Sequence, residues 1–431
     1  MSKEQIVVPP LDAEKTTKNQ LIENFRWPPD LDKELTRSTL LIGTRGAGKT
    51  MFLRRCRHQG PGLSIYADLR KILNPITSDT GAAGLSFREI PASQEQAIRA
   101  KAIVLLAQWL FASVWDNKVP LDISLLQRVL PPDLRSHTGS SVPEYLDSLR
   151  EAIEVAPLGI FAQNMRQSAF EDLLQRIGET VKEGYGSLTL LLDRAEEIPY
   201  PGLPPVMQLL DQRHEFLTVV ASRPGILGPD HQMSYDVPVP GDHYNLKHLG
   251  SSPYSAEWKA FMAEALDAWL PREVTNISDD ELSWLLFVAR DSMRNALEIL
   301  YNALDAQNVY DAIRARKQLS LIRDTQLKAA QGQMRRLNDD LGGLVRRVRQ
   351  RLGTVKLPVA VSIGGLPEPS LFSSPRHIRE MTRDEQTIYL GLRTGFFTTM
   401  DGFTWHPFRN VECVEIPPLF IWEEGDQWST I

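Results

Sequence analysis

The sequence predicts an α/β protein built on a parallel β-sheet that carries helices on both faces. Short, almost wholly apolar runs alternate along the chain with longer segments in which apolar residues recur every three or four positions. Strands buried on both faces give such runs, and helices packed against a sheet give the longer period. The first apolar run is followed directly by a glycine-rich segment, residues 43–50, where a strand would give way to a helix.

The core elements follow from these patterns. Four apolar runs are predicted to be strands, at residues 38–42, 63–66, 188–192 and 216–221. Helical periodicity predicts helices over residues 96–115, 143–154 and 163–182. We expect one α/β core over residues 21–250. The segment 91–182 is longer than a sheet crossover requires, so we expect a helical insert there.

Three further segments surround this core. Residues 1–20 are polar and aperiodic, which predicts a flexible tail and a folded part that begins near Leu21. Residues 251–318 are helical in pattern, and a capping box at Ser278–Glu281 starts one of the helices, so we expect a helical lid. Residues 319–431 form a separate C-terminal region. There a second capping box at Thr382–Glu385, followed by a hairpin turn at Asp401-Gly402, resembles a winged-helix module.

Composition excludes several classes of protein. A chain of 431 residues that is 42% hydrophobic and 24% charged is not disordered, collagenous or coiled-coil. The net charge of −6 means that any contact with nucleic acid depends on a local basic patch. Cys56 and Cys413 have no metal-ligand spacing, which argues against a disulfide framework and a zinc site. No signal-peptide pattern and no apolar run of about 18 residues occurs, so we expect a cytoplasmic protein without membrane contact.

The segment 43–50 reads GTRGAGKT and matches the phosphate-loop pattern GxxxxGK[ST] between a strand and a helix. Glycines let backbone amides wrap around a phosphate, and the following helix N-terminus adds about half a positive charge. Lys49 is expected to neutralise the β- and γ-phosphates of ATP, and Thr50 to ligate Mg²⁺. The expected nucleotide-binding residues of this loop are Gly43, Thr44, Arg45, Gly46, Ala47, Gly48, Lys49 and Thr50.

Acidic residues supply the second half of the predicted site. Asp193 follows the buried run 188–192, and a carboxylate at the end of a neighbouring strand is suited to hold the magnesium ion. Glu196 and Glu197 stand three and four residues further on, as candidates to orient or deprotonate the attacking water. An alternative interpretation makes the two glutamates an exposed helix start, where acidic side chains complement the helix dipole.

Over roughly residues 21–310 the chain resembles the P-loop ATPases of the AAA+ and STAND groups. The resemblance is carried by the segments GTRGAGKT, LLLDRAEE and VVASRP and by a downstream helical arginine. The resemblance is greatest to the branch of origin-recognition and replication-initiator ATPases and their bacterial relatives. In the common AAA+ pattern the catalytic base directly follows the aspartate, where this chain has Arg194. The STAND pattern instead has acidic residues three and four positions after it, as here.

The resemblance implies roles for further residues. Ser222 would be the sensor-1 group near the γ-phosphate, and Arg294 the sensor-2 arginine that reaches from the lid. Arg223 is the one candidate for an arginine finger, because no other Arg or Lys occurs before Lys247. The family's adenine pocket would be lined by Asn24, Phe25 and Trp27.

Each assignment has an alternative. Ser222 would instead cap the turn that follows it, Arg294 would be an exposed helix residue, and Arg223 would serve its own subunit. Phe25 and Trp27 would be core packing.

The C-terminal region carries a basic surface. Residues 323–356 hold nine Lys/Arg against three Asp/Glu on a helical pattern, and Gly342-Gly343 leaves open whether this is one helix or two. Double-stranded DNA is the candidate partner of residues 335–393, because arginines contact phosphates and the initiator branch binds DNA through a C-terminal winged helix. The arginines concerned are Arg335, Arg336, Arg346, Arg347, Arg349, Arg351, Arg379, Arg383 and Arg393. Alternatively these side chains form a solvated face, or pair with a protein partner or with the acidic tail, residues 411–431, which holds five acidic residues and no basic one.

The functional hypothesis is a magnesium-dependent ATPase that works as a switch. ATP would bridge the core and the lid and control assembly on DNA or with an effector protein, and self-association into a homo-oligomer is also considered. The resemblance implies a setting in a bacterial mobile element or in antiphage defence. The alternative is a non-hydrolysing scaffold that keeps ATP as a structural ligand and docks a protein partner. Arg194 beside Asp193 and the scarcity of finger arginines favour this alternative.

Overall fold

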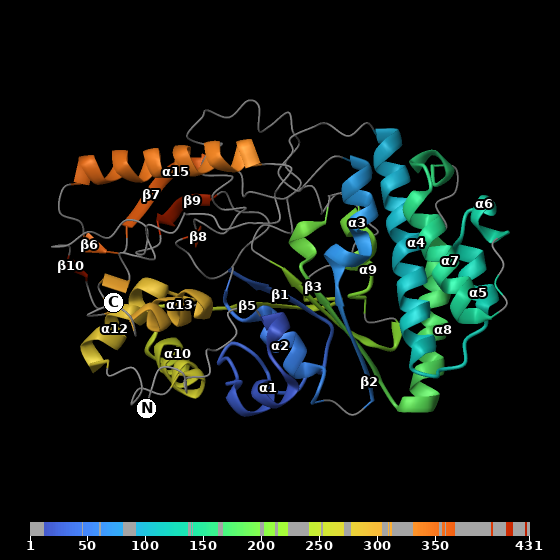
Figure 1. The fold of residues 1–431 in the computed structure, drawn as a ribbon, viewed down its shortest axis with the longest axis horizontal. Coiled ribbons are helices and arrows are strands. Elements are labelled where there is room, and N and C mark those ends of the chain that lie inside the picture. The colour runs from blue at the N-terminus through green and yellow to red at the C-terminus, as the bar shows by residue number, and fades with distance from the viewer. Residues whose placement is uncertain are drawn as a thin grey trace.

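The computed structural model describes residues 13–44, 46–59, 62–80, 92–136, 139, 141–162, 167–198, 202–211, 214–222, 241–250, 253–270, 277–303, 309, 311–312, 331–352, 356–357, 359–366, 398–399, 411–416 and 427–428. Its centre is a five-stranded, wholly parallel sheet with the order β2-β3-β4-β1-β5 (Figure 1). The strands are β1 (Thr39–Gly43), β2 (Leu63–Asp68), β3 (Leu188–Asp193), β4 (Leu217–Ser222) and β5 (Asn245–Leu249). The predicted α/β fold with a parallel sheet is confirmed.

One strand was missed by the sequence analysis. β5 reads NLKHL and pairs with β1 at the edge of the sheet, with Gly43 opposite Leu249. Four of its five residues are only partly buried. Since an edge strand has one open side, Lys247 and His248 are tolerated, and they interrupt the apolar run by which the inner strands were recognised.

Helices cover both faces of the sheet because alternate side chains of each strand enter different cores. Leu40 and Ile42 of β1 belong to one hydrophobic core and Leu41 belongs to the other. The first core is filled by α3 (Leu69–Thr80), the insert helices and α9 (Leu203–Gln208). The second contains α2 (Lys49–Cys56) and the lid helices, with α1 (Lys18–Asn24) packed against α2.

The segment that we expect to be an insert contains several helices. Its helices are α4 (Ala92–Asp116), α5 (Ile123–Val129), α6 (Pro132–Arg135), α7 (Val142–Val155) and α8 (Gln167–Tyr185). α4 contacts both α7 and α8, and α8 also contacts β3; the helices of this segment are grouped at the right of Figure 1. Within α4, Gln94–Asp116 is long and apolar enough to span a membrane by composition, but 78% of its most apolar window is buried in the protein. Its apolar surface therefore already has packing partners inside the fold.

The lid contains α10 (Ala256–Trp269), α12 (Asp279–Ala289) and α13 (Met293–Ala303). The capping box at the start of α12 is confirmed, with the Ser278 hydroxyl accepting from the Glu281 amide and the Glu281 carboxylate accepting from the Ser278 amide. α15 (Gln331–Leu352) is one continuous helix through Gly342 and Gly343, so the possible break there does not occur. Packing explains this, because Leu344 is buried in the same core as the lid helices.

The C-terminal region contains an antiparallel sheet in the order β7-β9-β8, made of β7 (Val359–Leu366), β8 (Thr398–Thr399) and β9 (Val411–Ile416). A second pair joins β6 (Lys356–Leu357) to β10 (Gln427–Trp428). The predicted helix start at Thr382–Glu385 and the predicted turn at Asp401-Gly402 lie outside the described residues. The winged-helix interpretation therefore stays a prediction.

The N-terminal tail was predicted too long. Residues Ala13–Lys15 form a 3-10 turn, η2, and α1 begins at Lys18, so structure is present before Leu21. A capping box starts α1, because the Thr17 hydroxyl accepts from the Gln20 amide while the Gln20 side chain accepts from the Thr17 amide. Arg54 of α2 anchors the segment by donating to the carbonyls of Ala13 and Thr16.

Candidate functional site

The loop between β1 and α2 has the backbone that the glycine pattern requires. Gly46 and Gly48 adopt φ of +90° and +99°, which L side chains rarely adopt. A Cβ at Gly46 would also lie 2.4 Å from the hydroxyl oxygen of Ser292, so glycine is needed there for space as well. α2 begins at Lys49, which points the amides of its first turn at the loop. Arg45 lies outside the described residues.

Lys49 lies under the loop. Its side chain is buried, and its ammonium nitrogen donates to the carbonyl oxygens of Gly43 at 2.7 Å and Thr44 at 2.8 Å. These contacts hold the cation at the centre of the loop. A buried ammonium beside a ring of backbone amides and a helix N-terminus is suited to an anionic ligand such as a phosphate chain.

Thr50 and Asp193 come together from different elements. The Thr50 hydroxyl donates a 2.7 Å hydrogen bond to the Asp193 carboxylate, which also accepts from the hydroxyl of Tyr66 at 3.1 Å and from the amide of Arg194 at 2.9 Å. Asp193 ends β3, which does not pair with β1, because β4 lies between these two strands. Asp193 still reaches Thr50 across the ends of the strands.

Electrostatics at Asp193 follow from its burial. The side chain is 2% exposed, and burial raises the pKa of this carboxyl above its ordinary value. The hydrogen bond from Thr50 lowers the pKa, while the neighbouring charge of Glu196 raises it. Burial also raises the pKa of Tyr66, which therefore stays protonated and donates to the carboxylate. A divalent cation would relieve the cost of burying the carboxylate charge.

The two glutamates after Asp193, Glu196 and Glu197, have different neighbours. Both lie on a short 3-10 helix, η4 (Ala195–Glu197), and both are partly buried, so they are not the exposed start of an α-helix. The Glu197 carboxylate lies 3.8 Å from Nε of Arg70. The negative charge of Glu196 instead raises the pKa of the Asp193 carboxyl.

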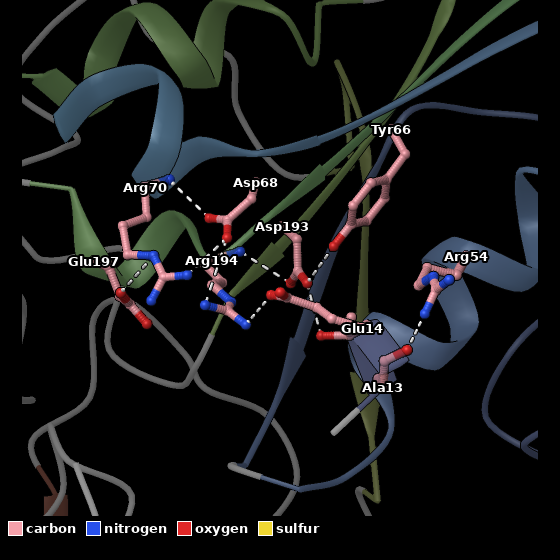
Figure 2. A network of polar contacts seen from close by, with 10 residues as sticks. Ala13, Glu14, Arg54, Tyr66, Asp68, Arg70, Asp193, Arg194 and Glu197 are labelled. Atoms are coloured by element: carbon pink, nitrogen blue, oxygen red, sulfur yellow. Dashed lines mark hydrogen bonds and ion pairs between the residues drawn. The ribbon is translucent and has the colours of Figure 1, made fainter. Parts of the chain in front are cut away.

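An ionic network that the sequence analysis missed surrounds these groups (Figure 2). Arg194 has a left-handed backbone, with φ of 66°, and pairs with Glu14 at 2.5 Å and with Asp68 at 3.5 Å. Asp68 also accepts from the guanidinium of Arg70 at 3.0 Å, which continues the network to Glu197. One residue of this network could have been recognised in the sequence. Asp68 is an acidic residue just after a predicted strand, and in the structure it lies beside Asp193 at the end of β3. The guanidinium of Arg194 is thus committed to carboxylates of its own chain.

Ser222 ends β4, opposite Ile42 of β1, so it lies at the same edge of the sheet as the loop and Asp193. Its side chain is fully buried, and its hydroxyl oxygen makes no hydrogen bond to another described residue. The turn that Ser222 would cap in the alternative interpretation lies outside the described residues. Arg223 lies outside them.

The lid meets the loop through the turn between α12 and α13. The Arg294 amide donates to the carbonyl of Gly46 at 3.2 Å, and the Thr44 hydroxyl donates to the Asp291 carboxylate at 2.7 Å. Arg294 is partly buried and is therefore not a freely exposed helix residue.

The aromatic residues near the N-terminus pack together. The rings of Phe25 and Trp27 are 5.6 Å apart, and Trp27 lies 5.5 Å from Phe52 of α2, both edge to face. The Trp27 indole donates to the carbonyl of Leu31 at 2.9 Å. Core packing thus accounts for these contacts, and a role in adenine binding stays a prediction. Asn24 is the last residue of α1.

The basic C-terminal surface is described only in part. On α15 the side chains of Arg346 and Arg347 are exposed and that of Arg349 is partly buried, while Leu344 faces the lid. No side-chain position is described for Arg335, Arg336, Arg351, Arg379, Arg383 or Arg393.

No group of three or more His, Cys, Asp or Glu side chains suited to hold a metal occurs among the described residues. The pair formed by Thr50 and Asp193 nevertheless fits Mg²⁺, which is usually bound through one or two protein oxygens together with phosphate oxygens and water. The strand order and the phosphate loop are those of the P-loop NTPase fold.

Comparisons with known proteins add little to this description. No protein-family model matches the sequence, and no curated protein matches it. One solved structure, a Walker-type ATPase of Pyrococcus abyssi, aligns over 89% of each chain at 13% identity with a TM-score of 0.42. A likeness of this size does not establish a shared activity.

Proposed function

We propose that this chain binds ATP with Mg²⁺ in the loop between β1 and α2 and hydrolyses it, as a switch that controls assembly with a partner. The contact that supports this most is the 2.7 Å hydrogen bond between Thr50 and Asp193. It joins a hydroxyl at the end of a phosphate loop to a buried carboxylate, which is the oxygen pair that a nucleotide-bound magnesium ion requires.

The roles follow from position. The loop amides and Lys49 hold the β- and γ-phosphates, and Thr50 with Asp193 holds the magnesium ion, which supplies charge neutralisation on the phosphate oxygens. In this proposal Ser222 donates to the γ-phosphate, and its position at the end of β4, opposite Ile42 of β1, supports that role. Arg294 approaches from the lid, whose backbone already contacts Gly46.

Of the two glutamates, Glu196 is our choice for the group that orients the attacking water. It lies close enough to Asp193 to affect the pKa of that carboxyl, whereas Glu197 lies beside Arg70. The water oxygen attacks the γ-phosphorus, the bond to the β-phosphate oxygen breaks, and that electron pair leaves with ADP. Glu196 accepts the proton from the water, and inorganic phosphate is released.

The first test is nucleotide binding by the full chain, measured with a fluorescent ATP analogue and Mg²⁺. Lys49→Ala removes the buried ammonium and should abolish binding, whereas Lys182→Ala, on the exposed surface of α8, is the matched control. Unchanged affinity in Lys49→Ala, with the fold intact by circular dichroism, would remove the phosphate-loop assignment.

A non-hydrolysing scaffold is the second candidate function. It is favoured by Arg194, which occupies the position of the usual AAA+ base and is paired with Glu14 and Asp68. Single-turnover hydrolysis separates the two functions. A switch converts bound ATP to ADP within minutes under saturating magnesium, and a scaffold returns intact ATP after hours.

We further propose double-stranded DNA as a partner through the C-terminal arginines, because Arg346 and Arg347 are exposed on α15. Replacement of both by glutamate should weaken binding to duplex DNA and lower its salt dependence, since each phosphate contact releases counterions. Equal affinity in the variant and the wild type would direct attention to a protein effector instead. The setting in antiphage defence or a mobile element, the cytoplasmic location and a homo-oligomer with Arg223 as its finger remain parts of this proposal that rest on the sequence alone.

A further inference from the structure

The turn that joins α12 to α13 is fitted closely against the phosphate loop. Two hydrogen bonds connect them, from the Thr44 hydroxyl to the Asp291 carboxylate at 2.7 Å and from the Arg294 amide to the Gly46 carbonyl at 3.2 Å. Asp291 is 4% exposed, so water does not compete for this contact. Buried hydrogen bonds to a charged acceptor are among the stronger ones in proteins.

Gly46 and Gly250 show how closely the turn between α12 and α13 packs against its neighbours. A Cβ at Gly46 would lie 2.4 Å from the Ser292 hydroxyl oxygen and 2.9 Å from the Arg294 Cβ. A Cβ at Gly250, directly after β5, would lie 2.6 Å from the Asp291 Cβ. The turn therefore has no space for a methyl group on either side, and it cannot move closer to Gly46 without displacing the loop.

The turn is held in an unfavourable backbone conformation. Arg290 has φ of 58° and ψ of −113°, outside the left-handed helical region that non-glycine residues tolerate best. Such residues persist where the surrounding structure holds them, and they cluster at functional sites. Here the Arg290 side chain is 6% exposed, its guanidinium lies 3.2 Å from the Asp291 carboxylate and stacks 5.9 Å from the Tyr254 ring.

The same contact reaches Lys49. Thr44 donates to Asp291 through its hydroxyl and accepts from the Lys49 ammonium through its carbonyl at 2.8 Å. Thr44 is thus hydrogen-bonded to the lid through its side chain and to Lys49 through its carbonyl oxygen. A carboxylate close to a phosphate site would otherwise repel the ligand, and the Arg290 pair offsets that charge.

We propose that Asp291 is a positioning residue for the nucleotide. By accepting from Thr44 it holds the phosphate loop in its binding conformation, and it makes nucleotide affinity depend on a docked lid. The inference rests on the proposed ATP binding and goes beyond it, since Asp291 contacts the loop and not the phosphates.

The test is a double-mutant cycle on the affinity and dissociation rate of a fluorescent ATP analogue with Mg²⁺. Thr44→Val keeps the shape of the side chain and removes its hydroxyl, and Asp291→Ala removes the acceptor. Each should weaken binding about tenfold or more through faster dissociation, because a buried hydrogen bond to a charged group is lost. The double variant should bind the ATP analogue almost as tightly as the single variant with the lower affinity, because both substitutions remove the same hydrogen bond.

Thr44→Ser supplies the rescue, because it restores the hydroxyl and should recover most of the affinity that Thr44→Val loses. Additive losses in the double variant, or wild-type affinity in Thr44→Val, would overturn the inference. If Asp291→Ala fails to fold, the comparison of valine with serine at position 44 still decides it. Absence of binding by the wild-type chain would instead overturn the proposed function, so the two failures are distinguishable.

Discussion

The hydroxyl of Thr50 and the carboxylate of Asp193 are joined by a 2.7 Å hydrogen bond although a whole strand, β4, lies between the strands that precede α2 and η4. The contact is possible because parallel strands end at one edge of the sheet, where β1 turns into the loop and β3 ends at Asp193. The edge also holds Asp68 and Ser222, the last residues of β2 and β4. Four strands thus deliver polar groups to one place.

Thr50→Val should weaken the magnesium dependence of ATP binding. It removes the hydroxyl that would ligate the ion and leaves Asp193 with one hydrogen bond fewer. The measurement is ATP affinity with Mg²⁺ and with EDTA, in which the wild type should show a large difference and the variant a small one. Thr50→Ser is the control and should keep the difference. A valine variant that responds to magnesium like the wild type would exclude Thr50 as a ligand.

Glu196→Gln should lower hydrolysis by about 10²-fold or more and spare ATP binding, because the amide no longer accepts the proton from water. Glu197→Gln is the matched comparison, and its effect should be much smaller since Glu197 lies beside Arg70. Single-turnover rates at saturating ATP check both. The opposite ranking would assign the water-orienting role to Glu197.

The core of this fold was predictable from sequence because its signals are local. An inner strand such as β3, which reads LTLLLD, is mostly apolar, and the loop glycines adopt positive φ. Both features can therefore be recognised in consecutive residues. The start of α1 also has a local signal, the capping box of Thr17 and Gln20, but its 7 residues are too few to show a helical period. β5 was missed because an edge strand does not need an apolar sequence.

The candidate site was predictable in its loop and acidic residues but not in its supporting contacts. The pairing of Arg194 with Glu14 joins residues 180 positions apart, and that of Thr44 with Asp291 joins residues 247 apart. Such pairs depend on how helices dock on the sheet. A single sequence shows the charges, but the identity of their partners is decided by tertiary packing.

Lys101 on α4 is fully buried, and it donates hydrogen bonds to backbone carbonyls at the C-terminal end of α7. Its ammonium donates to the carbonyls of Ala156 at 3.2 Å and Glu154 at 3.5 Å, and it lies 5.5 Å from the Phe161 ring. Lys101→Met should reduce the free energy of unfolding by about 1–3 kcal/mol, because these carbonyls lose their donor. Lys101→Ala should cost more, since it also leaves a cavity. Urea denaturation measures both, and a methionine variant as stable as the wild type would mean that desolvation of the ammonium cancels its hydrogen bonds.

The capping box of α12 predicts a pH dependence of stability. Hydrogen bonds from Ser278 hold the pKa of Glu281 below its ordinary value. A carboxyl with a lowered pKa in the folded state stabilises the protein above its ordinary pKa of about 4.3, and this stabilisation is lost as the pH falls through the folded-state pKa. Glu281→Gln keeps a side-chain oxygen for the cap and removes the titration. Its melting temperature should therefore lie below that of the wild type at pH 7, and the difference should shrink as the pH falls below about 4.3. A difference that stays constant over this range would contradict the prediction.

The strained backbone at Arg290 allows a test that separates the cost of the conformation from the value of the side chain. Arg290→Ala and Arg290→Gly both remove the ion pair with Asp291 and the contact with Tyr254. They differ in the backbone, because glycine adopts φ of 58° with ψ of −113° far more easily than alanine does. Arg290→Gly should therefore be more stable than Arg290→Ala by about 1 kcal/mol, although glycine ordinarily costs stability next to a helix. Thermal unfolding of the two variants gives this difference directly. If alanine proves the more stable of the two, the turn relaxes once the side chain is removed, and Arg290 imposes the conformation instead of tolerating it.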